Sequence, residues 1–189
     1  MAICLQAHQF ELYWKGEAIR SSGMHKSEWY ALCVRPRFER VAASHLQSRN
    51  IEQYLPLRRI TRQLVNGPRS IELPLLPGYV FCKTQAWMRC SLLSIPGVLY
   101  VAPGGISDQK ISEIKRTLQT GLNVQQWQFT PTGKTVTIQN GALESITGIL
   151  DRTASHARVV VISIDAIGRS IGVHLDNQYS LSFGTNSAA

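Results

Sequence analysis

The chain has 189 residues, of which 44% are hydrophobic and 17% charged, and it carries a formal net charge of +8 at pH 7. This length fits one or two small domains, the hydrophobic content is ordinary for a globular protein, and no apolar run approaches the roughly 20 residues that a membrane helix needs. Residues 1–8 also lack the basic and apolar pattern of a secretory signal. We therefore expect a monomer that is cytoplasmic and does not bind membranes.

The excess positive charge is concentrated in the first half of the chain, where few acidic residues interrupt it. The arginines concerned are Arg35, Arg37, Arg40, Arg49, Arg58, Arg59, Arg62 and Arg69. Such a density favours a polyanionic partner, most simply nucleic acid. A solvated basic face without a partner is the alternative, and composition alone leaves it open.

Residue types that carry chemistry do not gather into a recognisable pattern. The four cysteines never form a Cys-x-x-Cys pair, so we expect reduced structural thiols. The histidines lack metal-ligand spacing, the carboxylates lack paired spacing, and there is no phosphate-binding glycine loop or nucleophile elbow. We expect a protein that binds, with no catalytic residue, no metal and no cofactor.

The first half predicts alternating strands and helices. Residues 29–34 form an apolar, aromatic run typical of a buried strand. A helix from Arg37 follows, with an apolar face at helical spacing, and Asn50 is a plausible stop. That face contains Phe38, Val41, Ala42 and Leu46. Residues 51–55 predict a strand.

A hairpin is predicted next, because residues 60–65 and 69–75 flank Asn66-Gly67, a strong turn sequence. The hairpin projects Arg58, Arg59, Arg62 and Arg69, which are able to contact a phosphate backbone or simply to keep the arm solvated. The stretch 73–81 then combines prolines, a glycine and large apolar residues. Pro77 must interrupt strand pairing and Gly78 permits a turn, after which Tyr79 and Phe81 share one face of a new strand.

Two further helices and a strand complete the first domain. Residues 86–94 look helical, with an apolar side at Trp87, Cys90, Leu92 and Leu93. Residues 98–102 predict a strand. A helix capped by Ser107 or Asp108 has an apolar face at Ile111, Ile114 and Leu118 and ends at Gly121. The order β-α-β-β-β-α-β-α indicates an α/β (α+β) domain with an antiparallel sheet flanked by helices.

The remaining residues predict a second, all-β domain. Five short strands are expected at residues 135–138, 145–150, 158–164, 171–175 and 179–183, a number and spacing typical of a small SH3-like barrel. We divide the chain into an extension (1–26), a first domain (27–121), a linker (122–131), the barrel (132–184) and a polar tail (185–189). Trp127 and Phe129 are unusual in a free linker, so we expect part of it to pack on a domain.

Several motifs, taken together, resemble the NusG family of bacterial transcription factors. They are Trp29-Tyr30, Arg35-Pro36-Arg37 with Glu39, Tyr54-Leu55-Pro56, the stretch Pro74 to Phe81, Ile95-Pro96-Gly97-Val98, and then residues 133–150, which are similar to a KOW motif. The resemblance covers about residues 28–183. It implies an NGN domain followed by a KOW barrel, and the shortness and basicity of the chain look more like a specialised antitermination paralogue than the general factor.

The resemblance also implies roles for particular residues. Leu76, Tyr79 and Phe81 match a hydrophobic concavity that docks on the clamp helices of bacterial RNA polymerase, and Leu76 stands where phenylalanine is commoner. Arg89 matches a second polymerase-contacting region. By resemblance, Arg35, Arg37 and Arg40 begin a helix that lies near upstream or non-template DNA. From their charge alone, Arg58, Arg59 and Arg62 of the hairpin are also expected to bind nucleic acid. Leu143 matches an apolar KOW residue that binds Rho or a small-subunit ribosomal protein, but Glu144-Ser145 departs from the family pattern.

The function implied is transcription elongation or antitermination: binding that favours the closed clamp and suppresses pausing or termination. The alternative is a ribosome- or RNA-associated KOW protein, for which the basic first half would be the RNA-binding surface. A sequence-specific DNA-binding protein is disfavoured, because no helix-turn-helix spacing appears. The sequence leaves open whether the barrel stays bound to the first domain.

Overall fold

The computed structural model describes residues 26–65, 67–128, 134–151 and 158–183. The expected N-terminal extension up to residue 25, the tail from residue 184, Asn66 of the predicted turn and Phe129 of the expected linker lie outside the described residues. None of the helices in the described part of the chain is long and apolar enough to cross a membrane.

The first domain is built on a four-stranded antiparallel sheet in the order β2-β5-β1-β6. Its strands are β1 (Ser27–Val34), β2 (Glu52–Tyr54), β5 (Tyr79–Gln85) and β6 (Val98–Val101). Side chains alternate across β1, so that Tyr30 and Leu32 enter one apolar cluster while Trp29 and Ala31 enter another. The sheet is therefore covered on both faces, as an α/β domain requires.

Helix α2 (Glu39–Ser48) packs on the face of the sheet that carries Leu32, and it begins later than its sequence pattern predicts. Arg37 has a positive φ of 71°, which holds the preceding segment outside the helix. The buried side is consequently made by Ala42, Ala43 and Leu46, while Val41 is 40% exposed. Asn50 ends this region with a φ of 57°, as predicted.

Phe38, which was assigned to the apolar face of this helix, instead precedes the helix and packs on a glycine. A Cβ at Gly97 would lie 2.4 Å from the Cδ1 atom of Phe38, and Gly97 has a φ of 84°. The ring therefore occupies the space that the missing side chain leaves, which explains why glycine follows Pro96.

The helix predicted over residues 86–94 is shorter, comprising a 3-10 turn η1 (Ala86–Met88) and one turn of α-helix, α3 (Arg89–Leu92). Its predicted apolar side is wrong in three of four positions, since only Leu92 is buried, while Trp87, Cys90 and Leu93 are exposed. A single helical turn places only one of its four side chains against the core. The apolar spacing expected of a longer helix therefore does not hold here.

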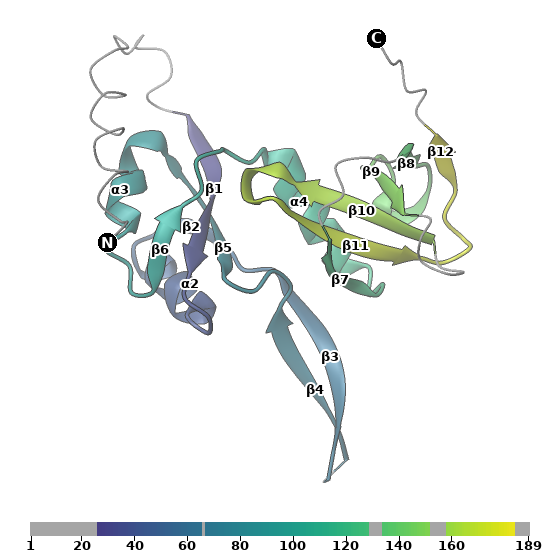
Figure 1. The fold of residues 1–189 in the computed structure, drawn as a ribbon, viewed down its shortest axis with the longest axis horizontal. Helices are drawn as coiled ribbons and strands as arrows, with labels where there is room; N and C mark the ends of the chain where they lie inside the picture. The colour runs from purple at the N-terminus through teal and green to yellow at the C-terminus, as the bar shows by residue number, and fades with distance from the viewer. Residues whose placement is uncertain (1–25, 66, 129–133, 152–157, 184–189) are drawn as a thin grey trace, which may run out of the picture.

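Helix α4 (Asp108–Gln119) covers the other face of the sheet and is the element on which the two domains meet (Figure 1). Ser107 caps it by accepting a hydrogen bond from the Lys110 amide, as predicted. Asp108 accepts hydrogen bonds from the indole of Trp29 (2.9 Å) and the ammonium of Lys83 (2.6 Å). The Lys83 hydrogen bond, and after it the Trp29 bond, lowers the pKa of Asp108.

The predicted hairpin forms a separate two-stranded ribbon, β3 (Leu57–Leu64) and β4 (Gly67–Pro74), which we call the arm. Leu64 pairs with Gly67, so Gly67 lies in β4 with a φ of 101°. Figure 1 shows the arm extending away from both sheets.

The second domain is a six-stranded antiparallel sheet in the order β12-β8-β9-β10-β11-β7. Its strands are β7 (Val124–Trp127), β8 (Lys134–Ile138), β9 (Thr147–Asp151), β10 (Arg158–Ile164), β11 (Arg169–Leu175) and β12 (Leu181–Phe183), with the short turns η2 (Gly141–Leu143) and η3 (Asp165–Ile167). All five predicted strands are present. The pairings of the described residues give an open sheet, so closure into a barrel stays a prediction.

Strand β7 lies inside the expected linker and pairs with β11. Trp127 holds it there, because its indole donates to Asp151 (2.8 Å) and its ring lies against Gly172, where a Cβ would approach to 2.6 Å. The expectation that Trp127 packs on a domain is confirmed.

Candidate functional site

The stretch 73–81 forms a tight turn that is fixed at three points. The Tyr79 amide donates to the Leu76 carbonyl (3.2 Å), and Gly78 has a φ of 82°, as the predicted bend at Pro77-Gly78 requires. The Gly78 carbonyl accepts from the Val34 amide at the end of β1 (2.8 Å). The Gly78 amide donates to the carboxylate of Glu39 (2.8 Å).

The sequence predicts no role for Glu39. It is the first residue of α2, it is only 5% exposed, and its carboxylate supplies the acceptor that the Gly78 amide lacks within the turn. A carboxylate at the start of a helix is also favoured by the helix dipole. Its place in the Arg35-to-Glu39 motif was visible, but a contact between positions 39 residues apart has no local sequence pattern.

Next to this turn, three side chains lie side by side across three strands of the sheet. They are Tyr79 on β5, Cys33 on β1 and Tyr100 on β6. The register pairs Tyr79 with Cys33 and Cys33 with Tyr100. The hydrogen bond with Cys33 raises the pKa of Tyr100 to about 12, and Tyr79 contributes in the same direction. Tyr100 is 49% exposed and Tyr79 is half-buried, so the row presents aromatic surface at one end of the sheet.

Of the three residues predicted to form a docking concavity, only Tyr79 is accessible. Leu76 is 1% exposed and Phe81 is fully buried in the cluster beneath α4, where the Phe81 ring stacks on Tyr54 at 6.4 Å. Leu76 and Phe81 therefore belong to the buried cluster on which the accessible Tyr79 packs. Tyr100, which the prediction omitted, joins Tyr79 because β6 pairs beside β1. We call Leu76, Tyr79, Phe81, Cys33 and Tyr100 the apolar face.

Arg89 lies on the opposite side of the sheet. Its guanidinium stacks over the ring of Tyr30 at 4.9 Å and donates to the Ala102 carbonyl at 3.1 Å. These contacts join α3 to β1 and to the residue that follows β6. Arg89 therefore has partners within the domain, and its predicted contact with a second protein stays a prediction.

The six arginines predicted to bind nucleic acid come from two regions of the first domain. Arg35 and Arg37 are exposed in the segment before α2, and Arg40 is exposed on its first turn. Arg58, Arg59 and Arg62 lie on β3, with Arg58 half-buried and the other two exposed.

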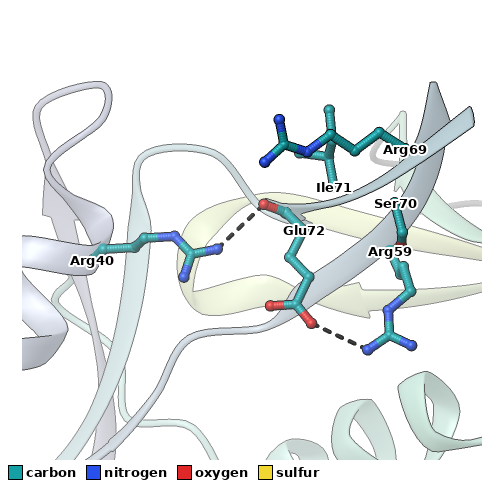
Figure 2. Close-up of a pocket in the computed structure, with 6 residues that line it drawn as sticks. All are labelled: Arg40, Arg59, Arg69, Ser70, Ile71 and Glu72. Atoms are coloured by element: carbon teal, nitrogen blue, oxygen red, sulfur yellow. Dashed lines mark hydrogen bonds and ion pairs between the residues drawn. The ribbon is translucent and has the colours of Figure 1, made fainter. Parts of the chain in front are cut away.

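The structure brings Arg40 next to the arm (Figure 2). Its guanidinium donates to the backbone carbonyl of Glu72 (3.3 Å), while Arg59 pairs with the Glu72 carboxylate (3.4 Å). Arg69 lines the same open hollow, which has a volume of about 700 Å³. Arg69 was predicted on the arm but was not among the expected contacts. With three arginines and one carboxylate among its lining residues, the hollow carries a net positive charge.

In the second domain, Leu143 lies in η2 and is fully buried, so the residue predicted to bind a KOW partner does not reach the surface. The turn is held against α4, because Arg116 donates to the carbonyls of Ala142 (2.8 Å) and Glu144 (3.0 Å). The neighbouring Lys115 lies 5.1 Å from the rings of both Trp29 and Tyr54. Adjacent residues of α4 thus contact the first sheet and the second domain. The role of Leu143 stays a prediction.

No metal centre is formed by the described residues, among which no three His, Cys, Asp or Glu side chains gather closely enough. The candidate site has two parts: the apolar face at the end of the sheet, and the basic region of α2 and the arm.

A protein-family model described as "Transcription termination factor nusG" matches residues 27–119. Among solved structures, the chain is similar to Thermotoga maritima NusG, in a structure titled "Domain interaction in Thermotoga maritima NusG", with 19% sequence identity, a TM-score of 0.48, and coverage of 81% of this chain and 95% of that chain. Among curated proteins, none matches.

Proposed function

We propose that this chain, which belongs to the NusG family of transcription factors by the match of residues 27–119, is a transcription elongation or antitermination factor. It binds bacterial RNA polymerase through its first domain. The observation that carries this proposal is the family match over the domain that holds the apolar face. The match includes the turn that presents Tyr79 and the strand that adds Tyr100.

The docking surface proposed for the clamp helices is the apolar face. Partly exposed aromatic side chains beside fully buried apolar ones are typical of an interface hot spot, where a few anchors supply most of the binding energy. Tyr79 and Tyr100 are the anchors, and Leu76 and Phe81 set their position. The Glu39–Gly78 hydrogen bond preorganises the turn, which reduces the ordering cost of docking.

The proposed mechanism is a shift in a conformational equilibrium of the polymerase. A bound protein shifts such an equilibrium only by binding one state more tightly than the other. Preference for the closed clamp lowers pausing and termination. No chemistry by this chain is needed, in keeping with a factor that acts by binding.

The second domain has the proposed task of recruiting a further partner through Leu143, either Rho or a small-subunit ribosomal protein. Since Leu143 is buried and Arg116 holds the adjacent carbonyls, recruitment requires that η2 leave α4. The strong positive charge further favours a specialised paralogue that also contacts upstream or non-template DNA.

In vitro transcription with purified polymerase tests the proposal. Saturating wild-type protein is expected to shorten pauses and to increase read-through at terminators. Tyr79→Ala is expected to need a much higher protein concentration for the same effects. Unchanged pause lifetimes at saturation would refute it.

A ribosome- or RNA-associated protein is the second candidate, and the net charge of +8 favours it. It predicts salt-sensitive RNA affinity without polymerase and no effect of changing Tyr79. Measuring RNA affinity with both variants therefore separates the two functions.

A further inference from the structure

In the part of the chain that the structure describes, the arm is held mainly by its own strand pairing, with a hydrogen bond from Arg40 to the Glu72 carbonyl (3.3 Å). Its two strands of eight residues pair only with each other, and a backbone hydrogen bond from Leu75 to Pro56 closes its base. Eight residues at about 3.3 Å each give a ribbon roughly 26 Å long. An isolated two-stranded hairpin is marginally stable in water, so a long projecting ribbon suggests a surface whose partner lies outside the chain.

The strand register divides the side chains of the arm between two faces. Arg59 pairs with Glu72 and Thr61 pairs with Ser70 on one face. Because side chains alternate along a strand, the residues between them lie on the other face. These are Arg58, Ile60, Arg62, Arg69, Ile71 and Leu73, which we call the arginine face. Figure 2 shows Arg69 and Ile71 on one side of the ribbon and the Arg59–Glu72 pair on the other.

The arginine face carries three cations and no acid. Glu72 is the only acidic residue of the arm, it lies on the other face, and it is paired with Arg59. In the described part of the chain, no carboxylate forms an ion pair with Arg58, Arg62 or Arg69. The charge of this face is therefore available to a partner.

Arg62 and Arg69 are direct cross-strand partners, and both are exposed. Like charges directly opposite each other destabilise a strand pair, by a few tenths to about 1 kcal/mol. A phosphate between the two guanidinium groups converts this repulsion into two charge-assisted hydrogen bonds. Arg58 lies four residues from Arg62, or about 13 Å along the strand.

These dimensions distinguish between nucleic acids. The major groove of B-DNA, about 12 Å wide, admits a two-stranded β-ribbon. The major groove of A-form RNA is too deep and narrow for side chains to read. Proteins that bind single strands stack bases on aromatic side chains, and residues 57–74 contain none.

We propose that the arm binds duplex DNA in the major groove through its arginine face, with Arg62 and Arg69 holding one backbone phosphate and Arg58 reaching the opposite wall of the groove. This deepens the proposed function, since it assigns the DNA contact of a polymerase-bound factor to the arm and to duplex DNA. In this proposal Arg69 contacts the DNA and Arg59 does not.

The test measures affinity of the full chain for a duplex of roughly 20 base pairs by fluorescence anisotropy between about 50 and 200 mM salt. Arg69→Ala is compared with Arg59→Ala, which removes the same charge from the same arm. Arg69→Ala is expected to lower the slope of log K against log salt by about 1 and to weaken binding several-fold, while Arg59→Ala leaves the slope unchanged. Because Arg62 and Arg69 share one phosphate, Arg62→Ala combined with Arg69→Ala is expected to lower the slope no further.

Equal losses for Arg59→Ala and Arg69→Ala would overturn the proposal, since only net charge would then matter. Tighter binding to single-stranded DNA or to duplex RNA of the same sequence would overturn it as well. Circular dichroism checks that the exposed substitutions leave the fold intact. Polymerase binding of the same variants is measured in parallel: it is expected to be retained, and its absence in wild type would refute the proposed function without touching the DNA result.

Discussion

Replacing Glu39 tests whether one buried carboxylate sets the geometry of the Leu76–Tyr79 turn. The carboxylate accepts a hydrogen bond from the Gly78 amide at 2.8 Å and is 5% exposed. A hydrogen bond to a charged group contributes about 1.5–3 kcal/mol, and an acidic residue in the first turn of a helix adds about 0.3–1 kcal/mol. Glu39→Ala is therefore expected to cost about 2–4 kcal/mol.

Glu39→Gln is the matched control, because the amide oxygen still accepts from Gly78 but carries no charge. A neutral hydrogen bond still contributes about 0.5–1.5 kcal/mol, so the glutamine variant is expected to lose only about 1–2.5 kcal/mol. Urea unfolding followed by circular dichroism gives both values, with an unchanged m-value showing that the denatured state is the same.

For a chain of this size, the alanine variant should melt roughly 4–16 °C lower than wild type. A cost below about 0.5 kcal/mol for Glu39→Ala would refute the reasoning, because the Gly78 amide would then find another partner without penalty. Equal costs for alanine and glutamine would show that side-chain volume, and not the hydrogen bond, is what matters.

Three further substitutions test the contacts around α4 and the turn. Gly78→Ala places a Cβ at a φ of 82° and is expected to cost about 1–2 kcal/mol in urea unfolding; no loss would mean that the turn relaxes freely. Asp108→Asn removes a carboxylate whose pKa is lowered by Lys83 and Trp29, so the stabilisation it provides is present above the usual pKa and is lost as pH falls. The stability difference from wild type should thus be constant near pH 7 and shrink below about pH 4, and a difference independent of pH would contradict this. Arg116→Ala removes two hydrogen bonds to η2, and amide exchange in residues 142–146 is expected to accelerate about tenfold; unchanged exchange would show that η2 is held by other contacts.

The parts of the fold that depend on local chemistry could be predicted from the sequence. Pro77-Gly78 fixes a turn because proline lacks an amide proton and glycine tolerates a positive φ, and the structure has that turn. Ser107 caps α4 for an equally local reason. The strands of the second domain were found because short runs rich in β-branched residues, such as residues 158–164, are typical of buried strands.

The errors arose where an apolar helical pattern was extended beyond the residues that form the helix. Val41 and Trp87 were assigned to buried faces of helices that are in fact shorter, and both are exposed. Tyr100 was not assigned to the apolar face because the order of strands in a sheet cannot be read from one strand. The burial of Leu143 under α4 depends on contacts between domains, for which the sequence contains no local pattern.

Binding of the full chain to core RNA polymerase, with Tyr79→Ala beside wild type, tests the central claim most directly. Phe183→Ala is the matched control, because it removes another exposed aromatic ring, from β12 of the second domain. We predict that wild type and Phe183→Ala bind alike and that Tyr79→Ala binds roughly 30-fold more weakly, the loss of about 2 kcal/mol expected of a hot spot. Equal binding by Tyr79→Ala, or no binding to polymerase alongside salt-dependent binding to RNA, would contradict the claim.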